Sequence, residues 1–345
     1  MDIFQVPDDR RYWVVRAESG RFYEHFVKYG VIALGHLDCI EFKDTSEGER
    51  FYPDEEELTD QFKKYREGKK YKKQSTSVQL AQAKSFIYDM SIGDWVVTIG
   101  SNLIRFGRII SNSYIDNTPL IVVYDPESGH QSEMEFKVRR EVSWGPSISK
   151  KELPYGLTQS LKSNLTVFNL DRHWQAVHHS LYPAFMKGGN LYLSSKIRSN
   201  DEIKNYSVSA ILTLLNEVEV IGKEFAKNNN LNNFEAIYNQ YIDDEQLTIT
   251  TKAQFHSPGD IWNAISSIVG EADRWETYVV VAYGMLFGNQ KLGFDGLLDL
   301  QTRQKLWDLV LQRLKKNKAE KVVESLQLEM PKTNTEKLED SSKDK

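Results

Sequence analysis

The chain has 345 residues, of which 40% are hydrophobic and 27% are charged, a composition typical of folded globular proteins and unlike that of disordered chains. This length accommodates two domains of ordinary size. The net charge of −5 excludes a uniformly basic nucleic-acid-binding protein, and the single cysteine, Cys39, excludes an internal disulfide and a zinc site made of several cysteines.

Membrane and export signals are not expected in this sequence. The longest apolar run in the C-terminal third covers about residues 278–287, whereas a membrane-spanning helix needs roughly 20 apolar residues. The first residues, MDIFQ, lack the basic start and apolar core of a secretory signal. We therefore expect a cytoplasmic protein with no membrane partner.

Strand-like segments dominate the first 145 residues. They are short, β-branched or aromatic, and bounded by Gly, Asp, Asn or Pro. They cover residues 13–16, 31–35, 94–100, 104–110, 120–124 and 136–144. Between them, the partly apolar face formed by Val78, Ala81, Phe86 and Met90 predicts a helix over residues 78–90.

A basic segment lies within this half of the chain. Residues 63–73, KKYREGKKYKK, hold seven basic residues and one acidic residue, and an acidic run at 54–57 precedes them. One interpretation is a solvated loop or helix. The other is an arm that contacts phosphates through Lys69, Lys70 and Lys72, with tyrosines available to stack on bases.

Several motifs of the N-terminal half belong together. They are Trp13-x-Val15-Arg16-Ala17, Phe26, Gly30-Val31-Ile32-Ala33-Leu34-Gly35, Gly93-Asp94-Trp95-Val96-Val97, Phe106-Gly107-Arg108-Ile109 and Arg139-Arg140-Glu141-Val142-Ser143-Trp144. In order and spacing, over about residues 10–150, this set resembles the PUA-like superfamily, in particular EVE-type domains and the module that precedes Mrr-like nuclease domains. The resemblance implies a small bent β-barrel that holds a modified or flipped base in an aromatic-lined pocket.

The candidate base-reading residues follow from this resemblance. Trp13, Trp95 and Trp144 are candidate walls of an aromatic pocket, because aromatic rings stack on the faces of a base. The candidate polar readers are Arg16 and Ser19 at the end of the first strand.

The candidate phosphate contacts are Arg105, Arg108, Arg139 and Arg140. Arg139 and Arg140 alternate along a strand, so only one of them faces a given partner. Each candidate also has a structural alternative: the tryptophans of apolar strands as core residues, and Arg16 in a structural ion pair.

The second half of the chain is predicted to be richer in helices. Helices are expected over residues 173–185, 208–225, 234–241, 261–270, 274–287 and 302–326, with one strand over 247–255. The polar stretch 194–205 is expected to link two domains. We therefore expect an α+β protein: a PUA-like bent β-barrel with packed helices in residues 1–195, a helix-rich α+β domain in residues 206–330, and a disordered polar tail in residues 331–345.

Metal and cofactor sites are not predicted. His173 and His178 are five residues apart, which places them about 140° apart around a helix and prevents them from sharing an ion. The chain lacks both a Walker A motif and a dinucleotide-binding glycine motif.

Three functions remain open at this level. The first is a module that binds nucleic acid, with DNA favoured over RNA, and recognises a modified or flipped base. Its C-terminal domain would bind an effector protein or a second copy of the chain. The resemblance implies a role in restriction or anti-phage defence. The second is a scaffold that binds protein through residues 302–326. The third is a divergent Mg²⁺-dependent nuclease using Asp295, Asp299 and Lys305, since residues 293–296 resemble the Gly-x-Asp-Gly element of Mrr-like nucleases.

Overall fold

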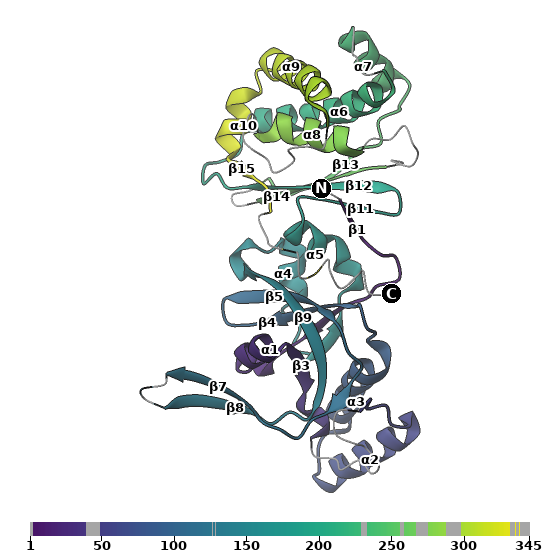
Figure 1. Ribbon diagram of the computed structural model, residues 1–345, viewed down its shortest axis with the longest axis vertical. Helices are drawn as coiled ribbons and strands as arrows, with labels where there is room; N and C mark the ends of the chain where they lie inside the picture. Colours follow the sequence, from purple (N-terminus) through teal and green to yellow (C-terminus); the bar gives the residue numbers. More distant parts are fainter. Residues whose placement is uncertain are drawn as a thin grey trace. The chain divides into compact units, whose positions relative to one another are not determined.

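The computed structural model describes residues 3–38, 49–125, 127, 129–228, 233–255, 259–266, 275–287, 298–331, 335 and 338. The chain divides into two compact units. The half-barrel unit comprises Asp9–Val177 and Thr333–Lys345, and the helical unit comprises Met1–Asp8 and His178–Lys332. Both units mix helices and strands, so the protein is of the α+β class (Figure 1).

One curled sheet forms the half-barrel unit, with strands ordered β10-β2-β4-β5-β9-β3. Its strands are β2 (Tyr12–Val15), β3 (Val31–Leu34), β4 (Trp95–Ile99), β5 (Leu103–Ile109), β9 (Val138–Ser149) and β10 (Val167–Asn169). Neighbours are antiparallel except β2 and β4, which run parallel. The short strand β6 (Tyr114–Ile115) pairs with β9 outside this order.

The curl of the sheet comes from β9, which has 12 residues. Its first part pairs with β3 and its later part with β5, where the register shifts between Arg105 and Gly107. A Cβ at Gly107 would lie 2.5 Å from Val142 Cγ1 and 2.6 Å from Trp144 Cε3. Only glycine therefore lets these side chains pack across the irregular strand pair.

Helices pack on this sheet. They are α1 (Tyr23–Tyr29), α2 (Glu55–Gly68), α3 (Lys73–Lys84) and α4 (Tyr155–Ser160). A single wide turn, Ser85–Asp89, continues α3 towards β4. The core beneath them contains Phe26, Phe62 and Phe86, each 0% exposed, so the burial of aromatic rings holds the helices on the sheet.

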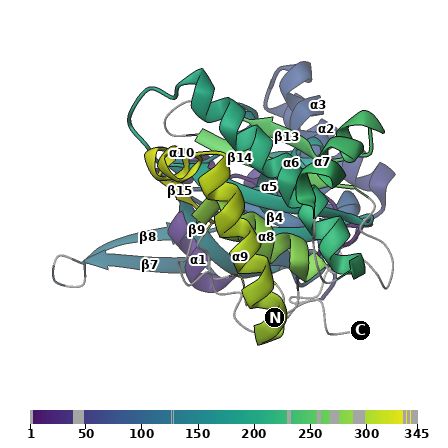
Figure 2. The ribbon, with the colours of Figure 1, turned by 90° about the horizontal axis from the view of Figure 1, so that it is seen from above.

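A two-stranded ribbon extends from the half-barrel unit (Figures 1 and 2). It consists of β7 (Leu120–Asp125) and β8 (His130–Met134), which pair with each other. Helix α1 anchors its base: the Tyr29 hydroxyl donates to the carbonyl oxygen of Ile121 at 2.7 Å, and the His25 ring lies 2.8 Å from the carbonyl oxygen of Ser132.

The helical unit has a second sheet, ordered β1-β11-β12-β14-β13, with β15 paired to β12. Its strands are β1 (Phe4–Gln5), β11 (Ala184–Lys187), β12 (Asn190–Ile197), β13 (Thr250–Ala253), β14 (Gly259–Ile265) and β15 (Leu328–Glu329). Its helices are α6 (Asn205–Asn228), α7 (Phe234–Asp243), α8 (Trp275–Phe287), α9 (Leu300–Lys316) and α10 (Glu320–Leu326). Helix α5 (Trp174–Leu181) precedes β11 and spans the division between the units.

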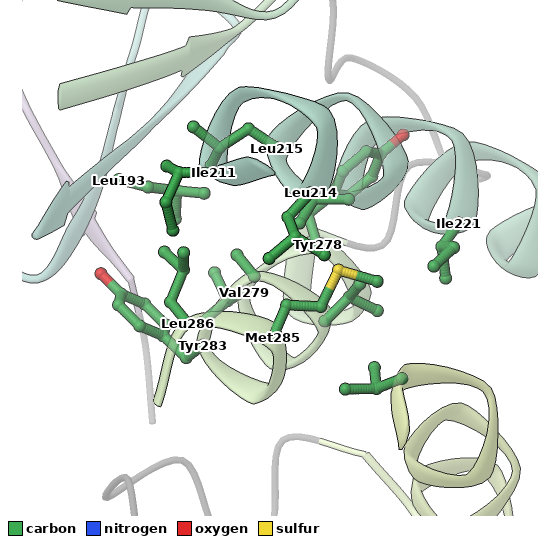
Figure 3. Packing of buried hydrophobic residues seen from close by; sticks show 14 of the residues in the cluster. Leu193, Ile211, Leu214, Leu215, Ile221, Tyr278, Val279, Tyr283, Met285 and Leu286 are labelled. Carbon is green, nitrogen blue, oxygen red and sulfur yellow. The ribbon is translucent and has the colours of Figure 1, made fainter. Parts of the chain in front are cut away.

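Helices α6 and α8 form the core of the helical unit (Figure 3). Ile211 and Leu214 of α6 pack with Val279 of α8, and each is 0% exposed. Leu193 of β12 completes the contact with the sheet. Nearly every side chain of α8 is buried, as expected for a helix that is apolar on all sides.

Most predicted elements of the half-barrel unit are confirmed. The strands expected at residues 13–16, 31–35, 94–100, 104–110, 120–124 and 136–144 all exist, with ends shifted by a few residues. The helix expected at 78–90 begins earlier, at Lys73, and changes to the wide turn at Ser85.

The helix predicted over residues 261–270 is wrong in its described part. Residues 259–265 form β14, whose side chains alternate between buried and partly exposed. The reason is tertiary pairing: β14 lies between β12 and β13 and bonds to both. The short apolar run alternates with period two, which favours a strand over a helix.

Three further boundaries differ from expectation. The predicted linker 194–205 begins within β12. The predicted helix 173–185 ends at Leu181, and β11 starts directly after Pro183. The predicted helix 302–326 is two helices, because Lys318 adopts a left-handed conformation (φ 51°) between α9 and α10. Most of the predicted disordered tail lies outside the described residues, although Leu338 is described and is 0% exposed beside Gly145.

Candidate nucleic-acid interface

The three candidate tryptophans lie inside the half-barrel unit. Trp13 and Trp95 are 2% and 0% exposed, and Trp144 is 7% exposed. The indole N–H of Trp13 donates to Asp94 Oδ2 at 3.0 Å, and that of Trp144 donates to the carbonyl oxygen of Phe26 at 2.7 Å. Their faces pack in the interior, so they form no open aromatic pocket.

The candidate arginines of the strands are also buried. Arg108 donates through Nε to the carbonyl oxygen of Gly93 at 2.7 Å, and its guanidinium lies over the Trp95 ring. Arg139 bonds to Asp116 at 2.7 Å and to the carbonyl oxygens of Phe136 and Thr118. Both side chains are 1% exposed, so neither presents its charge to a phosphate.

Arg16 supports a loop rather than standing free at the surface. Its guanidinium donates to the carbonyl oxygens of Leu161 and Ser163, the latter at 2.6 Å, and its backbone N–H donates to Thr166 O at 2.8 Å. Burial lowers the pKa of this guanidinium. Ser19, three residues further along the chain, lies in an exposed turn with φ 55°.

Gln82 of α3 holds the same loop from the other side. Its Oε1 accepts the N–H of Thr166 at 2.6 Å and that of Val167 at 2.9 Å. Arg16 and Gln82 therefore fix residues 161–167 between β2 and α3. This loop is the wall of a pocket.

A pocket of about 400 Å³ lies between α3 and this loop, within the size range of small-ligand sites. Its lining comprises His36, Lys72, Gln74, Ser75, Val78, Gln79, Gln82, Asn164, Leu165 and Thr166. Four of its lining side chains carry amides: Gln74, Gln79, Gln82 and Asn164. Burial lowers the pKa of His36, which favours its neutral imidazole.

Six lysines lie on α2, on the turn that follows it and at the start of α3, and one of them, Lys72, lines the pocket. We call them the lysine hairpin, because they occupy the C-terminal end of α2, the turn and the start of α3. They are Lys63, Lys64, Lys69, Lys70, Lys72 and Lys73, all exposed. In the described part of the chain none of them forms an ion pair.

The turn of the lysine hairpin has a rigid support. Arg66 is 8% exposed and lies 3.5 Å from the centre of the Tyr71 ring. It also donates to Ser75 Oγ at 3.1 Å, which joins α2 to α3. The basic segment is therefore ordered by its one arginine, and its lysines stay available to solvent.

Helix α2 separates the acidic run from the lysines. Asp54 caps the start of the helix by accepting the N–H groups of Glu56 and Glu57. Over the 14 residues of α2, a rise of about 1.5 Å per residue places the end of the helix, and with it the start of the turn that holds Lys69 and Lys70, about 20 Å from this cap. Negative charge at the first turn and positive charge at the last turn also match the helix dipole.

The sequence-based reading missed most of the pocket residues. His36, Gln82 and Asn164 come from three segments that are far apart in the chain, and no spacing rule joins them. The one available signal was the pair Gln79 and Gln82, which are three residues apart and so share a face of the helix.

The residues of the nuclease hypothesis do not form a described site. Asp295 and the glycine-rich element at 293–296 lie outside the described residues, as does Cys39. Asp299 caps α9 by accepting the Thr302 N–H at 2.9 Å, and Lys305 is exposed on that helix. Within the described ranges, no group of three or more His, Cys, Asp or Glu side chains is placed to hold a metal ion.

No described helix combines the length and apolar character needed to cross a membrane. A scan against protein-family models gives no match, and searches among curated proteins and solved structures give none. The resemblance to PUA-like domains therefore rests on the motifs of the sequence.

Proposed function

We propose that the protein binds nucleic acid, DNA before RNA, through the lysine hairpin and the pocket beside it. The main support for this proposal is that the two features adjoin, since Lys72 belongs to both the hairpin and the pocket lining. Exposed lysines without carboxylate partners neutralise phosphates and release counterions. A ligand that follows the hairpin with its phosphates would carry a base to the pocket mouth.

The chemistry of the pocket fits a base edge. Asn and Gln side chains offer a donor and an acceptor together and pair with base edges. Gln74, Gln79 and Asn164 provide such groups at the pocket. Unstacking a base so that it can enter a pocket costs a few kcal/mol. Phosphate contacts along the hairpin would offset that cost.

This proposal differs from the aromatic pocket expected from the sequence. The tryptophans pack in the hydrophobic core. Arg16 is a positioning residue, because it holds the loop of residues 161–167 that forms one wall of the pocket. The recognition of a modified or flipped base, and a place in restriction or anti-phage defence, remain proposals drawn from the PUA-like resemblance.

Two variants test the hairpin. Replacing Lys69, Lys70 and Lys72 with Gln should weaken binding to a DNA oligonucleotide about 100-fold near physiological salt and reduce the salt slope by about 3, since each lost phosphate contact removes about one unit. The matched control replaces Lys151, Lys305 and Lys315, which are also exposed. Equal affinities for the two triple variants would reject the hairpin as the binding surface.

A second pair of variants tests the pocket. Val78 is 40% exposed and lines the pocket, so Val78→Trp would fill it without breaking a hydrogen bond. Ala81 is an exposed residue of the same helix outside the lining, so Ala81→Trp is the control. Val78→Trp should abolish any preference among unpaired or modified bases while preserving the salt slope. A preference that survives in Val78→Trp would place base reading elsewhere.

A further inference from the structure

A cluster of polar groups lies at one end of the half-barrel sheet. Thr98 of β4 and Arg105 of β5 are register partners, so their side chains share one face of the sheet. The register of β5 against β9 shifts between Arg105 and Gly107, and such an irregularity re-aims side chains. We call Tyr23, Thr98 and Arg105 the Arg105 cluster. None of them lines the pocket beside the lysine hairpin.

Tyr23 of α1 joins the two strand residues. A Cβ added to Gly100, the residue after β4, would lie 3.0 Å from Tyr23 Cγ, so the ring packs directly on the backbone of the β4–β5 hairpin. Burial raises the pKa of the Tyr23 hydroxyl, and the charge of Arg105 lowers it. The Arg105 guanidinium therefore lies close to that hydroxyl.

Each member of the Arg105 cluster has a buried polar atom with no hydrogen-bond partner among the described residues. The atoms are the hydroxyl oxygen of Tyr23, Oγ1 of Thr98 and Nε of Arg105. Thr98 is 0% exposed and Tyr23 is 6% exposed. Because buried polar groups are nearly always bonded, three unbonded atoms in one cluster point to a ligand.

The positive charge of this cluster is not compensated. The other three arginines that the sequence suggests as phosphate contacts donate to backbone carbonyl oxygens. Arg105 is half-buried and forms no ion pair with any residue that the structure describes. Glu24, the carboxylate that acts on the pKa of Tyr23, has the smallest effect on it and is exposed. Since a cation withdrawn from water needs a paired anion, the cluster selects an anionic ligand.

Two turns with exposed residues lie next to the cluster. The turn after β2 holds Glu18, Ser19 and Gly20 at φ 47°, 55° and 96°. A Cβ on Gly20 would lie 3.4 Å from the carbonyl carbon of Gly100, so this turn packs against the β4–β5 hairpin. Left-handed residues other than glycine cost free energy and concentrate at ligand sites. The cluster therefore lies at the end of the sheet that these turns border.

We propose that the Arg105 cluster binds a small oxyanion, which is the phosphate or the carboxylate group of a small molecule. Arginine forms paired, charge-assisted hydrogen bonds with such groups, and the hydroxyls of Tyr23 and Thr98 can donate to the same oxygens. A bound oxyanion would give all three unbonded atoms a partner and would link α1 to the β4–β5 hairpin. This inference does not depend on nucleic-acid binding.

Calorimetry with the full chain tests the proposal, with sodium phosphate and sodium acetate as the probes and sodium chloride at equal ionic strength as the blank. We expect binding of at least one probe, weakened at least tenfold in Arg105→Gln and in Tyr23→Phe/Thr98→Val. The probe that binds more tightly identifies the source of the oxyanion. The control is Arg172→Gln, an exposed arginine of the same unit, which should bind as the wild type does.

Three results of the calorimetry would overturn the proposal. They are no heat of binding with either probe, wild-type affinity in Arg105→Gln, and an equal loss in Arg172→Gln, which would assign binding to surface charge in general. Phosphate bound by the lysine hairpin is distinguished by the triple lysine variant, because that variant should keep its affinity for the probe at the Arg105 cluster.

The stability of the free protein gives a second measurement. Tyr23→Phe/Thr98→Val removes only hydroxyls that have no partner, so the thermal unfolding midpoint in chloride should stay the same or rise. The matched control Tyr88→Phe removes a hydroxyl that donates to Pro53 O at 2.8 Å, and its midpoint should fall. The preferred probe should raise the midpoint of the wild type and leave that of the double variant unchanged. A lower midpoint of the double variant in chloride would show that these hydroxyls already have partners, which contradicts the proposal.

Discussion

The interior of the half-barrel and the lysine hairpin use positive charge in opposite ways. Arg140 is 1% exposed and donates to four backbone carbonyl oxygens, those of Phe86, Ile87, Met90 and Ser111. The hairpin lysines are exposed and have no ion-pair partners among the described residues. Both regions are basic runs in the sequence. The difference shows that cations on core strands stabilise the fold, while those on a helix end remain available for a ligand.

The largest effect is expected at Arg140. Arg140→Met leaves the carbonyl groups around Phe86 and Met90 without donors. The unfolding free energy should fall by about 4 kcal/mol, because unsatisfied buried groups cost roughly 1–3 kcal/mol each. The individual costs do not add up in full, since all these bonds are made by one side chain. Urea unfolding measures this loss. Lys70→Met on the exposed turn should change stability by less than about 0.5 kcal/mol. Similar losses in both variants would contradict a structural role that is particular to the buried Arg140.

Trp144 distinguishes a core role from base reading. Trp144→Ala should lower the unfolding free energy by about 3 kcal/mol, because it leaves a cavity against Gly107 and frees the carbonyl of Phe26. DNA affinity at a temperature where the variant is folded should equal that of the wild type. A stable variant with lost affinity would return Trp144 to the binding surface.

A buried histidine shows what happens when the interior offers no compensation for a charge. Burial, with a smaller contribution from Lys252, lowers the pKa of His179 to about 3; the ring stacks on Trp262 and bonds to Ser194. Below the unfolded pKa of about 6.5, only the unfolded chain takes up the proton, so stability is lost as pH falls from 6.5 towards 3.

Between pH 6.5 and 4.5 this loss should reach about 2 kcal/mol, because the slope rises to about 1.36 kcal/mol per pH unit only once the unfolded histidine is mostly protonated. Urea unfolding of the wild type and of His179→Gln at both pH values measures it, and the variant should lack this part of the pH dependence. An identical pH dependence in both proteins would contradict a neutral buried His179.

The smallest effect is expected for one hairpin lysine. Lys72→Gln should weaken DNA binding by about 1 kcal/mol at physiological salt and reduce the salt slope by about 1, with no change in stability. Fluorescence anisotropy at several salt concentrations gives both values. A change in affinity with an unchanged slope would mean that Lys72 contacts the base in the pocket instead of a phosphate.

Local sequence patterns determined most elements of this protein. Short β-branched runs between turn residues located the strands of the half-barrel, and the periodicity of residues 208–225 located α6. They failed where pairing decided the structure: β14 is a strand because it lies between two others. Helix α9 ends where Lys318 turns left-handed, which no local pattern indicated.

The candidate site depended on tertiary structure. The sequence identified the lysines and Arg16, because charge density and a strand end are local properties. It left burial of the tryptophans as one of two alternatives and did not reveal that Arg139 is buried, because burial depends on which strands curl around these side chains. Nor did it reveal the pocket, since His36, Gln82 and Asn164 become neighbours only when β10 pairs with β2 and Gln82 binds the Thr166 and Val167 N–H groups.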